Sequence, residues 1–390
     1  MDASVHPMSD DRETEELEQE SRGHRNAVPL LATHLGAEWR HLAAARERTE
    51  RVRRELAEAV EGRVPDDTSV VAFGSLARDE FGGESDIDWT LLVDGPADPA
   101  HLGAAQELGQ VIHHHGREPG REGTFGSLAF GHELIHRIGG EDDTNSNTTR
   151  RILLLLESTP LGPRRAYNRV LANVLSRYLD EDRGLWTGRR SPDHAVRAKV
   201  PRFLLNDISR YWRTMLVDFA YKQRSRAGRG WAVRNIKLRM SRKLIFLSGL
   251  LTCFSPVLEL DEGQVEAMFG GAASDGGDSG VQLLTRHLLG VIERPPLETV
   301  ARALLRQSEG GWPHDDAARD LFGAYDDFLD LITDEATRGE LSELSYGDLA
   351  DSPAFTRGRR IASRFQGAVA EIFLHGDGPL ARLTIDHGIF

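Results

Sequence analysis

Two aspartates one residue apart, Asp86 and Asp88, stand in the stretch GESDIDWTLLV. Residues two apart in an extended chain project from the same face, so both carboxylates point the same way. Like charges on one face repel each other unless a cation lies between them. Mg²⁺ is such a cation, because it binds a few carboxylates together with phosphate oxygens and retained waters. The pattern predicts a magnesium site that acts on a phosphate-bearing substrate, with both aspartates as metal ligands and catalytic residues.

A glycine and a serine, Gly74 and Ser75, precede the aspartates in the same region. They follow Ser69–Phe73, a β-prone run, and we expect them to form a turn that opens a short helix over Leu76–Glu80. Glycine lets the backbone approach a ligand closely, and the free N–H groups at a helix start suit phosphate. Asp86–Val93 is expected to be the next strand. The turn therefore predicts a phosphate contact beside the metal ligands.

Further helices and strands must hold this turn in place. Gly36–Glu61 is rich in Ala, Glu, Arg and Leu and predicts one long helix, and Pro96 to about His115 predicts another. Thr124–Phe130 and Glu133–Ile138 are expected to be two more strands, closed by a Gly-Gly turn. The chain up to about residue 143 is therefore a small mixed α/β unit, and the pattern beyond it is helical.

The order of these elements predicts an α+β fold, with a small mixed-sheet domain followed by an all-helical bundle domain. The boundaries follow changes in composition. The predicted segments are a disordered acidic N-terminus at 1–28, the mixed-sheet domain with its N-terminal helix at 29–143, a helical bundle domain at 144–268, a flexible Gly-rich insertion at 269–280 and a C-terminal helical region at 281–390.

Gly74 and Ser75 followed by Asp86 and Asp88, in a strand–turn–helix–strand context, resemble the DNA polymerase β-like nucleotidyltransferase superfamily. The resemblance implies that residues 29–143 are a nucleotidyltransferase catalytic domain. It also implies transfer of a nucleoside monophosphate from an NTP to an acceptor hydroxyl, with release of pyrophosphate. The two aspartates would hold two Mg²⁺ ions, and the Gly-Ser turn would contact the terminal phosphates of the NTP.

Members of this superfamily usually carry a third carboxylate on a neighbouring strand, where it is a metal ligand or a general base. Glu133 is the candidate, because its segment HELIHRIGG resembles the corresponding strand of the glutamine synthetase adenylyltransferases. The segment departs from that family in having Glu for the more usual Asp, and His136 where an apolar residue is common. Asp142 and Asp143 are the alternatives, although helix capping would also explain one of them. The last alternative is that there is no third carboxylate, which would indicate a weak or inactive enzyme.

The stretch GEDDTNSNTTRRILLLLESTPLG, residues 140–162, is similar to the segment after the catalytic strands of the protein uridylyltransferases and the DUF294-type nucleotidyltransferases. An acidic residue, a long apolar helix and a Gly-terminated turn occur there in that order. On this resemblance Arg150 and Arg151 face phosphate at the domain junction. Solvated arginines at a helix start are the alternative.

A basic window interrupts the acidic chain. Residues 197–243 contain fourteen Lys or Arg residues and two Asp residues. Superfamily members commonly bind the NTP between the catalytic sheet and a helical bundle, so Lys237, Arg239 and Lys243 are predicted to hold the triphosphate. The second candidates are Arg210 and Arg213. Basic side chains on a solvated helix face would give the same pattern, so both interpretations stay open.

The composition of the chain limits the class of protein, its partners and its location. The 390 residues carry a formal net charge of -13 at pH 7, with 39% hydrophobic and 28% charged residues, as is usual for globular proteins. An acidic chain is unsuited to coating nucleic acid, so nucleic acid is not an expected partner. The N-terminus lacks the apolar core of a signal peptide and no apolar run reaches membrane-spanning length, so a cytoplasmic protein is expected. The single cysteine, Cys253, excludes an internal disulfide framework and a multi-cysteine zinc site.

The leading interpretation is a Mg²⁺-dependent nucleotidyltransferase with ATP or another NTP as donor. A protein hydroxyl is the favoured acceptor, because of the resemblance to protein-modifying enzymes and because the large helical half could recognise a partner. A small molecule, as in the aminoglycoside nucleotidyltransferases, is the nearest alternative, and an RNA 3′ end suits the acidic charge less well. The other class is a catalytically inactive relative that binds nucleotide or a partner as a regulatory module.

Overall fold

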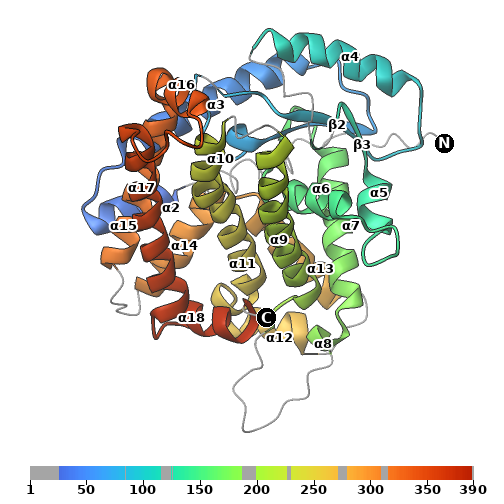
Figure 1. Ribbon diagram of the computed structural model, residues 1–390. Helices are drawn as coiled ribbons and strands as arrows, with labels where there is room; N and C mark the ends of the chain where they lie inside the picture. Colours follow the sequence, from blue (N-terminus) through green and yellow to red (C-terminus); the bar gives the residue numbers. More distant parts are fainter. Residues whose placement is uncertain are drawn as a thin grey trace, which may run out of the picture.

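The structure is a computed structural model that describes residues 26–83, 85–115, 124, 126–186, 199–225, 230–270, 279–308 and 315–388. Most of the acidic N-terminus predicted at 1–28, and most of the insertion predicted at 269–280, lie outside the described residues. Figure 1 shows a small sheet at one end of a larger set of helices. The predicted α+β class is therefore confirmed.

Four strands form the sheet: β1 (Thr68–Phe73), β2 (Trp89–Val93), β3 (Leu128–Phe130) and β4 (Ser158–Leu161), in the order β3-β2-β1-β4. β1 pairs antiparallel with both β2 and β4, whereas β2 and β3 run parallel. A parallel pair needs a crossover connection, which includes α4 (Ala100–His113). The predicted mixed sheet is confirmed, and its fourth strand comes from beyond residue 143, where a domain boundary is predicted.

The strand predicted over Glu133–Ile138 is wrong, because Gly131–His136 forms helix α5. A short segment with apolar residues at mixed spacing satisfies either a strand or a helix pattern, and packing decides between them. Here Leu134 is buried, and a Cβ atom at Gly131 would lie 2.7 Å from Val170 Cγ2. The close approach of α5 to the neighbouring helix α7 (Arg165–Glu181) is compatible with the helix.

The helix predicted over Leu76–Glu80 is also wrong. The structure has a 3₁₀ turn, η1 (Gly74–Leu76), followed by Asp79 at φ 62°. Positive φ is incompatible with a continuing right-handed helix. An ion pair of 2.7 Å between Asp79 and Arg53 of α3 (Arg40–Val60) holds this conformation.

Helices cover both faces of the sheet and extend well beyond it (Figure 1). They are α2 (Ala27–Leu35), α3 (Arg40–Val60), α6 (Asn145–Leu156), α7 (Arg165–Glu181), α8 (Arg183–Trp186), α9 (Arg202–Ser225), α10 (Trp231–Lys237), α11 (Lys243–Leu258), α12 (Glu262–Phe269), α13 (Gly280–Ile292), α14 (Pro296–Ser308), α15 (Asp315–Thr333), α16 (Glu335–Glu343), α17 (Pro353–Ala370) and α18 (Pro379–Leu383). The π-helical segments are η2 (Leu238–Arg242), η3 (Glu371–His375) and η4 (Thr384–Gly388).

Buried apolar side chains of the described residues form three clusters. The first lies between the sheet face that carries Val71 and Leu92 and helices that include α6, α7, α9 and α11. The second lies under α3 and α4, on the face that carries Val70 and Leu91. The third joins α2 and the start of α3 to α14, α15 and α17. Because α3 belongs to the second and third clusters, it connects the sheet to the C-terminal helices.

One long helix runs through the helical part. α10, η2 and α11 follow without a break from Trp231 to Leu258, between α9 and α17 (Figure 1). In a search of the described residues, this was the one helix long and apolar enough to cross a membrane. Within its most apolar window 72% of the residues are buried inside the fold. Its composition is therefore that of a core helix.

A buried ionic cluster joins α6, α7 and α9. The Arg151 side chain is 0% exposed and donates to Asp143 at 2.9 and 3.1 Å and to Asp207 at 2.7 Å. It also donates to the Tyr178 hydroxyl at 2.6 Å. A guanidinium is tolerated in a core only when its charge and its N–H groups are matched in this way. Arg151 therefore faces neither phosphate nor solvent.

Candidate active site

The Gly74-Ser75 turn and the aspartate pair meet where β1 ends. The Phe73 N–H donates to the Asp88 carbonyl oxygen at 2.8 Å, so the backbone holds the second aspartate beside the turn. Gly74 has φ 69°, in the left-handed region that favours glycine. A Cβ atom there would lie 3.0 Å from Asp88 Oδ2, so the absence of a side chain leaves room for the carboxylate. The structure thus brings the predicted turn and the predicted aspartates together.

The two aspartates alternate with a core residue. Asp86 and Asp88 are exposed, whereas Ile87 between them is 1% exposed. The strand expected over Asp86–Val93 is β2, which starts later, at Trp89, so both aspartates lie in the segment just before it. Surrounding protein atoms, and to a smaller extent the charge of Asp86, raise the pKa of Asp88. A cation between the two carboxylates would relieve both effects.

The donor set suits Mg²⁺, which proteins commonly hold through one or two carboxylates plus substrate phosphates. Asp86 and Asp88 supply the carboxylates, and Gly74 supplies the space beside them. No group of three or more His, Cys, Asp or Glu side chains that could hold a metal is found in the described part of the chain. Phosphate oxygens and retained waters commonly complete the coordination of Mg²⁺.

Basic side chains face Asp88 from two parts of the chain. The charges of Arg242, Arg78 and Lys237 each favour the ionised form of Asp88 and oppose the rise in its pKa. Arg78 follows the turn after β1, while Lys237 and Arg242 belong to the long helix. Carboxylates and cations in one site allow a metal ion and an anionic ligand to bind side by side.

Two buried carboxylates hold these arginines in place. Glu80 is 2% exposed, pairs with Arg78 at 2.8 Å and accepts a hydrogen bond from the Tyr325 hydroxyl at 2.5 Å. Glu157 is also 2% exposed and pairs with Arg78 and, at 2.9 Å, with Arg242. The network joins the turn after β1 to α6, the long helix and α15. It therefore orients both guanidinium groups and holds the sheet against the helices.

Arg78, Glu80 and Glu157 were not among the residues predicted from the sequence. The available signal for Arg78 is that it stands only three residues after Ser75, beside the predicted phosphate contact. Glu157 gives no local signal, since Arg78 and Arg242 lie far away in the sequence. Glu80 stands two residues after Arg78, but its other partner, Tyr325, is distant in the sequence.

The three side chains predicted to hold the triphosphate do not all have the same surroundings. Lys237 acts on Asp88, but Lys243 donates to Gln366 and lies over the Trp212 ring, with Nζ 5.9 Å from its centroid. Arg239 lowers the pKa of Lys243 and is half-buried. The π turn η2 separates Lys237 from Lys243 and changes the rotation between them, so that Arg242 faces Asp88. Helical spacing in the sequence does not reveal such a turn.

Glu133 lies in α5, where its side chain is 34% exposed and pairs with Arg137 at 3.4 Å. The extended strand on which its prediction depended is absent, and the strand parallel to β2 is Leu128–Phe130, which has no carboxylate. Its role as third metal ligand or base stays a prediction.

The alternatives to Glu133 have other surroundings. Asp143 is buried, pairs with Arg151 and accepts a hydrogen bond from the Gly139 N–H at 3.2 Å. Asp142 is exposed.

Arg210, a second candidate for phosphate binding, donates to the Asp143 carbonyl oxygen at 2.7 Å, and Arg213 is exposed on α9. Asp143 and Arg210 therefore belong to the buried cluster around Arg151.

Lys237 is held in its charged form at the expense of stability. Burial and the charges of Arg338, Arg78 and Arg242 lower its pKa to about 8. A group whose folded pKa is lowered in this way destabilises the fold while it is protonated. An anionic ligand bound beside it would offset that effect.

Lys237→Met is therefore expected to raise the free energy of unfolding at pH 7 and to weaken nucleotide binding. Wild-type stability should rise between about pH 8 and 10.5, since the unfolded chain keeps the lysine proton longer than the folded one. The advantage of the variant, measured by urea denaturation, should shrink over that range. Lys222→Met on α9 is the control and should show no such trend. An advantage that does not change with pH would contradict the assignment.

Gly74→Ala tests the space beside Asp88. A left-handed conformation costs a side chain about 1–2 kcal/mol, and the new Cβ would also press on Asp88 Oδ2. Gly62→Ala is a matched control, because Gly62 has φ 71° and no atom lies within 4 Å of the added Cβ. Both variants should lose similar stability in denaturation, but Gly74→Ala alone should bind Mg²⁺ and nucleotide more weakly in calorimetric titrations. If Gly62→Ala weakened Mg²⁺ and nucleotide binding as much as Gly74→Ala, the space beside Asp88 would not be what the ligands need.

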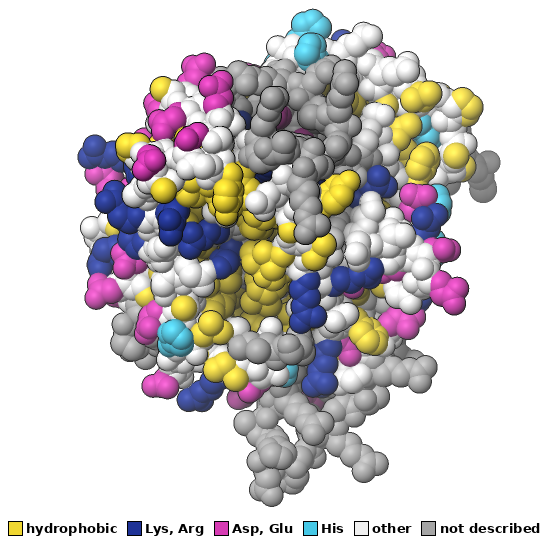
Figure 2. All heavy atoms as spheres, viewed as in Figure 1, with side chains coloured by type: hydrophobic (Ala, Val, Ile, Leu, Met, Phe, Trp, Pro, Cys, Tyr) yellow, Lys and Arg dark blue, Asp and Glu magenta, His cyan; other side chains and the backbone are white. Residues whose placement is uncertain are grey.

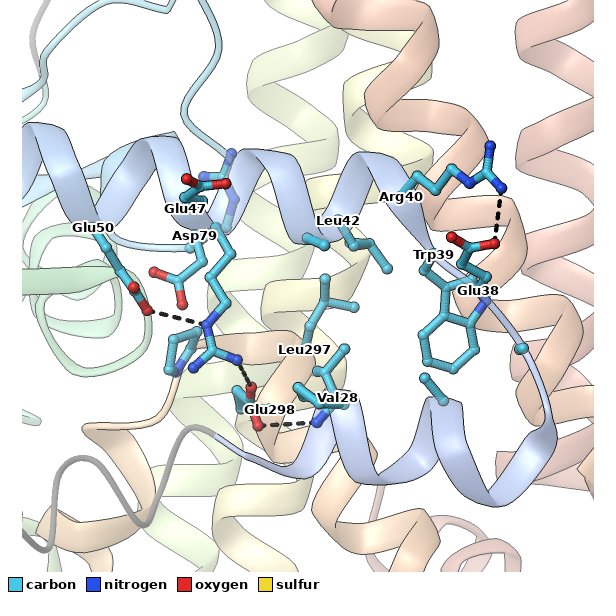
Figure 3. A pocket seen from close by; sticks show the side chains of 17 residues that line it. Val28, Glu38, Trp39, Arg40, Leu42, Glu47, Glu50, Asp79, Leu297 and Glu298 are labelled. Carbon is cyan, nitrogen blue, oxygen red and sulfur yellow. Dashed lines mark hydrogen bonds and ion pairs between the residues drawn. The ribbon is translucent and has the colours of Figure 1, made fainter.

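A cavity of about 580 Å³ lies between α3, α2 and the start of α14 (Figure 3). Its walls are largely apolar and include Val28, Trp39, Leu42 and Leu297. Glu298 lines it, accepting from the Ala27 N–H at 2.7 Å and from Arg46 at 3.2 Å. The cavity reaches Asp79 and Arg78, one of the cations around Asp88, whereas Asp86 and Asp88 do not line it.

Residues 53–120 match the family model described as the nucleotidyltransferase domain. The match includes the Gly-Ser turn and both aspartates, and it confirms the resemblance to the DNA polymerase β-like superfamily over this part of the chain. Searches of curated proteins and of solved structures found no match.

Proposed function

We propose that this chain, whose residues 53–120 carry a nucleotidyltransferase domain, moves a nucleoside monophosphate from an NTP to an acceptor hydroxyl with release of pyrophosphate. The observation that carries the proposal is the meeting of Gly74 with Asp88, beside cations from the turn and from the long helix. Carboxylates for Mg²⁺ and cations for phosphate are what such a transfer needs.

In this reaction the acceptor oxygen forms a bond to the α-phosphorus, and the bond from that phosphorus to the α,β-bridging oxygen breaks. The hydroxyl proton passes to a base, for which Glu133 remains the candidate. Asp86 and Asp88 would hold Mg²⁺, which when bound supplies charge neutralisation for the attacking oxygen and for the leaving pyrophosphate. The Gly74-Ser75 turn would contact the terminal phosphates. Catalysis would then rest on positioning and electrostatics.

The basic side chains around Asp88 would receive the phosphates. Lys237 and Arg242 approach from the long helix, and Arg78 approaches from the turn. Arg239 and Lys243, which the sequence also predicts as phosphate contacts, would have to move away from their present neighbours to take part. The buried pairing of Arg78 and Arg242 with Glu157 favours a site that is organised before the nucleotide binds.

A protein is the favoured acceptor. Large apolar side chains lie exposed on α9, among them Leu216 at 42%, Val217 at 71% and Tyr221 at 67%. Figure 2 shows an apolar hollow on the face of the molecule where α9 and the long helix lie, with Lys and Arg side chains on both sides of it. Exposed apolar patches with a charged rim are typical of surfaces that bind proteins. A cytoplasmic partner fits the expected location of the chain.

The test is incubation of the purified protein with each α-labelled NTP, Mg²⁺ and a lysate, followed by separation of proteins from small molecules. Label is expected in the protein fraction, and it should disappear when Asp86 and Asp88 are both replaced by asparagine. Label in the small-molecule fraction would favour the alternative acceptor class. No label with any NTP would overturn the proposal.

The second candidate is an inactive nucleotide-binding module. The observation that favours it is the lack of a group of three metal-binding side chains among the described residues. Such a module would bind NTP in a calorimetric titration but would label no acceptor. Binding without transfer would therefore decide for the module.

A further inference from the structure

A second, smaller cavity lies at the free edge of the sheet. It has a volume of about 330 Å³, within the usual range for small-molecule sites. α3 forms one wall, and β4 with the start of α7 forms the other. The residues that line it are Arg53, Arg54, Ala57, Ser158, Thr159, Pro160, Leu161, Arg164, Tyr167 and Glu293. Asp86, Asp88 and the cations around them are not among these residues.

The charge in this cavity is positive. Arg53, Arg54 and Arg164 line it, and Glu293 is the one carboxylate among its lining residues. Glu293 pairs with Arg164 Nη2 at 2.6 Å, but Arg164 Nε is buried without a hydrogen-bond partner. Arg54 is exposed, and within the described part of the chain its Nε donates a long bond of 3.4 Å to the Glu50 main-chain carbonyl. Donors for an anion are therefore present on both walls.

The polar groups around the arginines suit a phosphate. Ser158 and Thr159 of the edge strand add hydroxyl groups, and α7 begins beside Arg164, so its positive end lies at the cavity. Guanidinium groups bind phosphate through paired, charge-assisted hydrogen bonds. A carboxylate or a neutral ligand would leave part of the positive charge unmatched.

Arg53 connects this cavity to the candidate active site. Its side chain is 10% exposed, and its Nε donates to the Leu76 carbonyl oxygen at 2.8 Å, at the end of the Gly74–Leu76 turn. Its Nη1 pairs with Asp79 Oδ1 at 2.7 Å, where φ is positive. An anion in the cavity would compete with these two acceptors for the same guanidinium. Binding at the sheet edge would thus act on the turn that carries Gly74 and Ser75.

We propose that the cavity between α3 and β4 is a binding site for a small phosphate-bearing anion, and that its occupation weakens nucleotide binding through Arg53. The coupling part rests on the proposed function, whereas the anion site does not. By linkage, nucleotide bound at the active site would weaken the anion to the same extent.

Binding is tested first in the Asp86→Asn/Asp88→Asn protein, so that the result does not depend on an intact active site. Titration with inorganic phosphate at low ionic strength, followed by calorimetry, should show one saturable site. Arg54→Gln should weaken it about fivefold, and Arg54→Gln/Arg164→Gln about fiftyfold or more, because charge-assisted hydrogen bonds are lost. Pyrophosphate and a sugar phosphate, titrated in the same way, separate the free anion from a phosphate ester as the preferred ligand.

The matched control is Arg51→Gln, which removes the same charge from an exposed position on α3 outside the cavity. It should leave phosphate affinity unchanged. Equal weakening by Arg51→Gln, or no saturable binding at all, would overturn the site. Arg54 is exposed, so its replacement should not disturb folding, and near-ultraviolet circular dichroism checks this for the double variant.

The coupling is tested in the wild-type protein with a fluorescent ATP analogue. Saturating phosphate should weaken the analogue at least threefold, and Arg54→Gln/Arg164→Gln should abolish this effect. Weakening that persists in the double variant would mean direct competition at the active site and would overturn the coupling. If the analogue does not bind at all, the proposed function fails, while the result of the phosphate titration still stands.

Discussion

Replacing Asp88 with asparagine should slow nucleotide transfer by about two to three orders of magnitude, the usual effect of removing one strong electrostatic contact to a transition state. Asparagine has nearly the same shape, so the hydrogen bond from the Phe73 N–H to the Asp88 carbonyl is kept. What is lost is the charge that would hold Mg²⁺ beside the phosphates. The measurement is the rate of label transfer to the acceptor at saturating NTP.

The fold should not suffer from this change. The surrounding protein atoms raise the pKa of Asp88 despite the nearby cations, so its ionised form contributes no net stability to the folded state at neutral pH. Asp88→Asn should therefore unfold at an equal or higher urea concentration than wild type. Asp66→Asn is the control, an exposed aspartate just before β1 whose loss should change neither rate nor stability. A variant that retains transfer, or that loses activity by unfolding, would contradict the role given to Asp88.

Arg151→Met should cost about 3–5 kcal/mol of unfolding free energy, the range found when one partner of a buried ion pair is removed. Methionine fills much of the same volume, so the loss comes from charge rather than from a cavity. The change removes the partner that the buried Asp143 carboxylate, the buried Asp207 carboxylate and the Tyr178 hydroxyl share. Urea denaturation followed by tryptophan fluorescence measures the change.

Arg150→Met on the same helix is the matched control. Arg150 is partly exposed and its Nε donates to the Thr124 carbonyl oxygen, so its loss should cost less than about 1 kcal/mol. Adding Asp143→Asn and Asp207→Asn to Arg151→Met should recover part of the stability, since the uncompensated charges are then gone. If Arg151→Met lost no more unfolding free energy than Arg150→Met, the buried cluster around Arg151 would contribute little to folding.

Much of the fold follows from local patterns. The run before Gly74 and the run after Asp88 are apolar and β-prone, and both are strands. The helix predicted over Gly36–Glu61 is α3 with a later start, at Arg40. The prediction failed at Glu133–Ile138, because its length and spacing suit a strand or a helix equally and close packing against α7 decides.

The residues of the candidate active site also fall into two groups, those that the sequence predicts and those that only the structure shows. Gly74, Ser75, Asp86 and Asp88 could be found from the sequence, because the chemistry needs them in one short stretch with a fixed spacing. The basic partners were identified only in part. The charges of Lys237 and Arg242 act on Asp88, whereas Lys243 donates to Gln366, and the predicted contacts of Lys237, Arg239 and Lys243 with the triphosphate stay predictions.

By itself, the sequence determined the turn, the aspartate pair and the class of chemistry that they indicate, since each depends on residues close together in the chain. Only the tertiary structure decided which charges surround them. Glu80 and Glu157 select and orient Arg78 and Arg242, and Arg53 reaches from α3 to the Leu76 carbonyl. The physical reason is that an ion pair depends on distance in space. Which guanidinium pairs with a buried carboxylate is therefore decided by how helices distant in the sequence pack together.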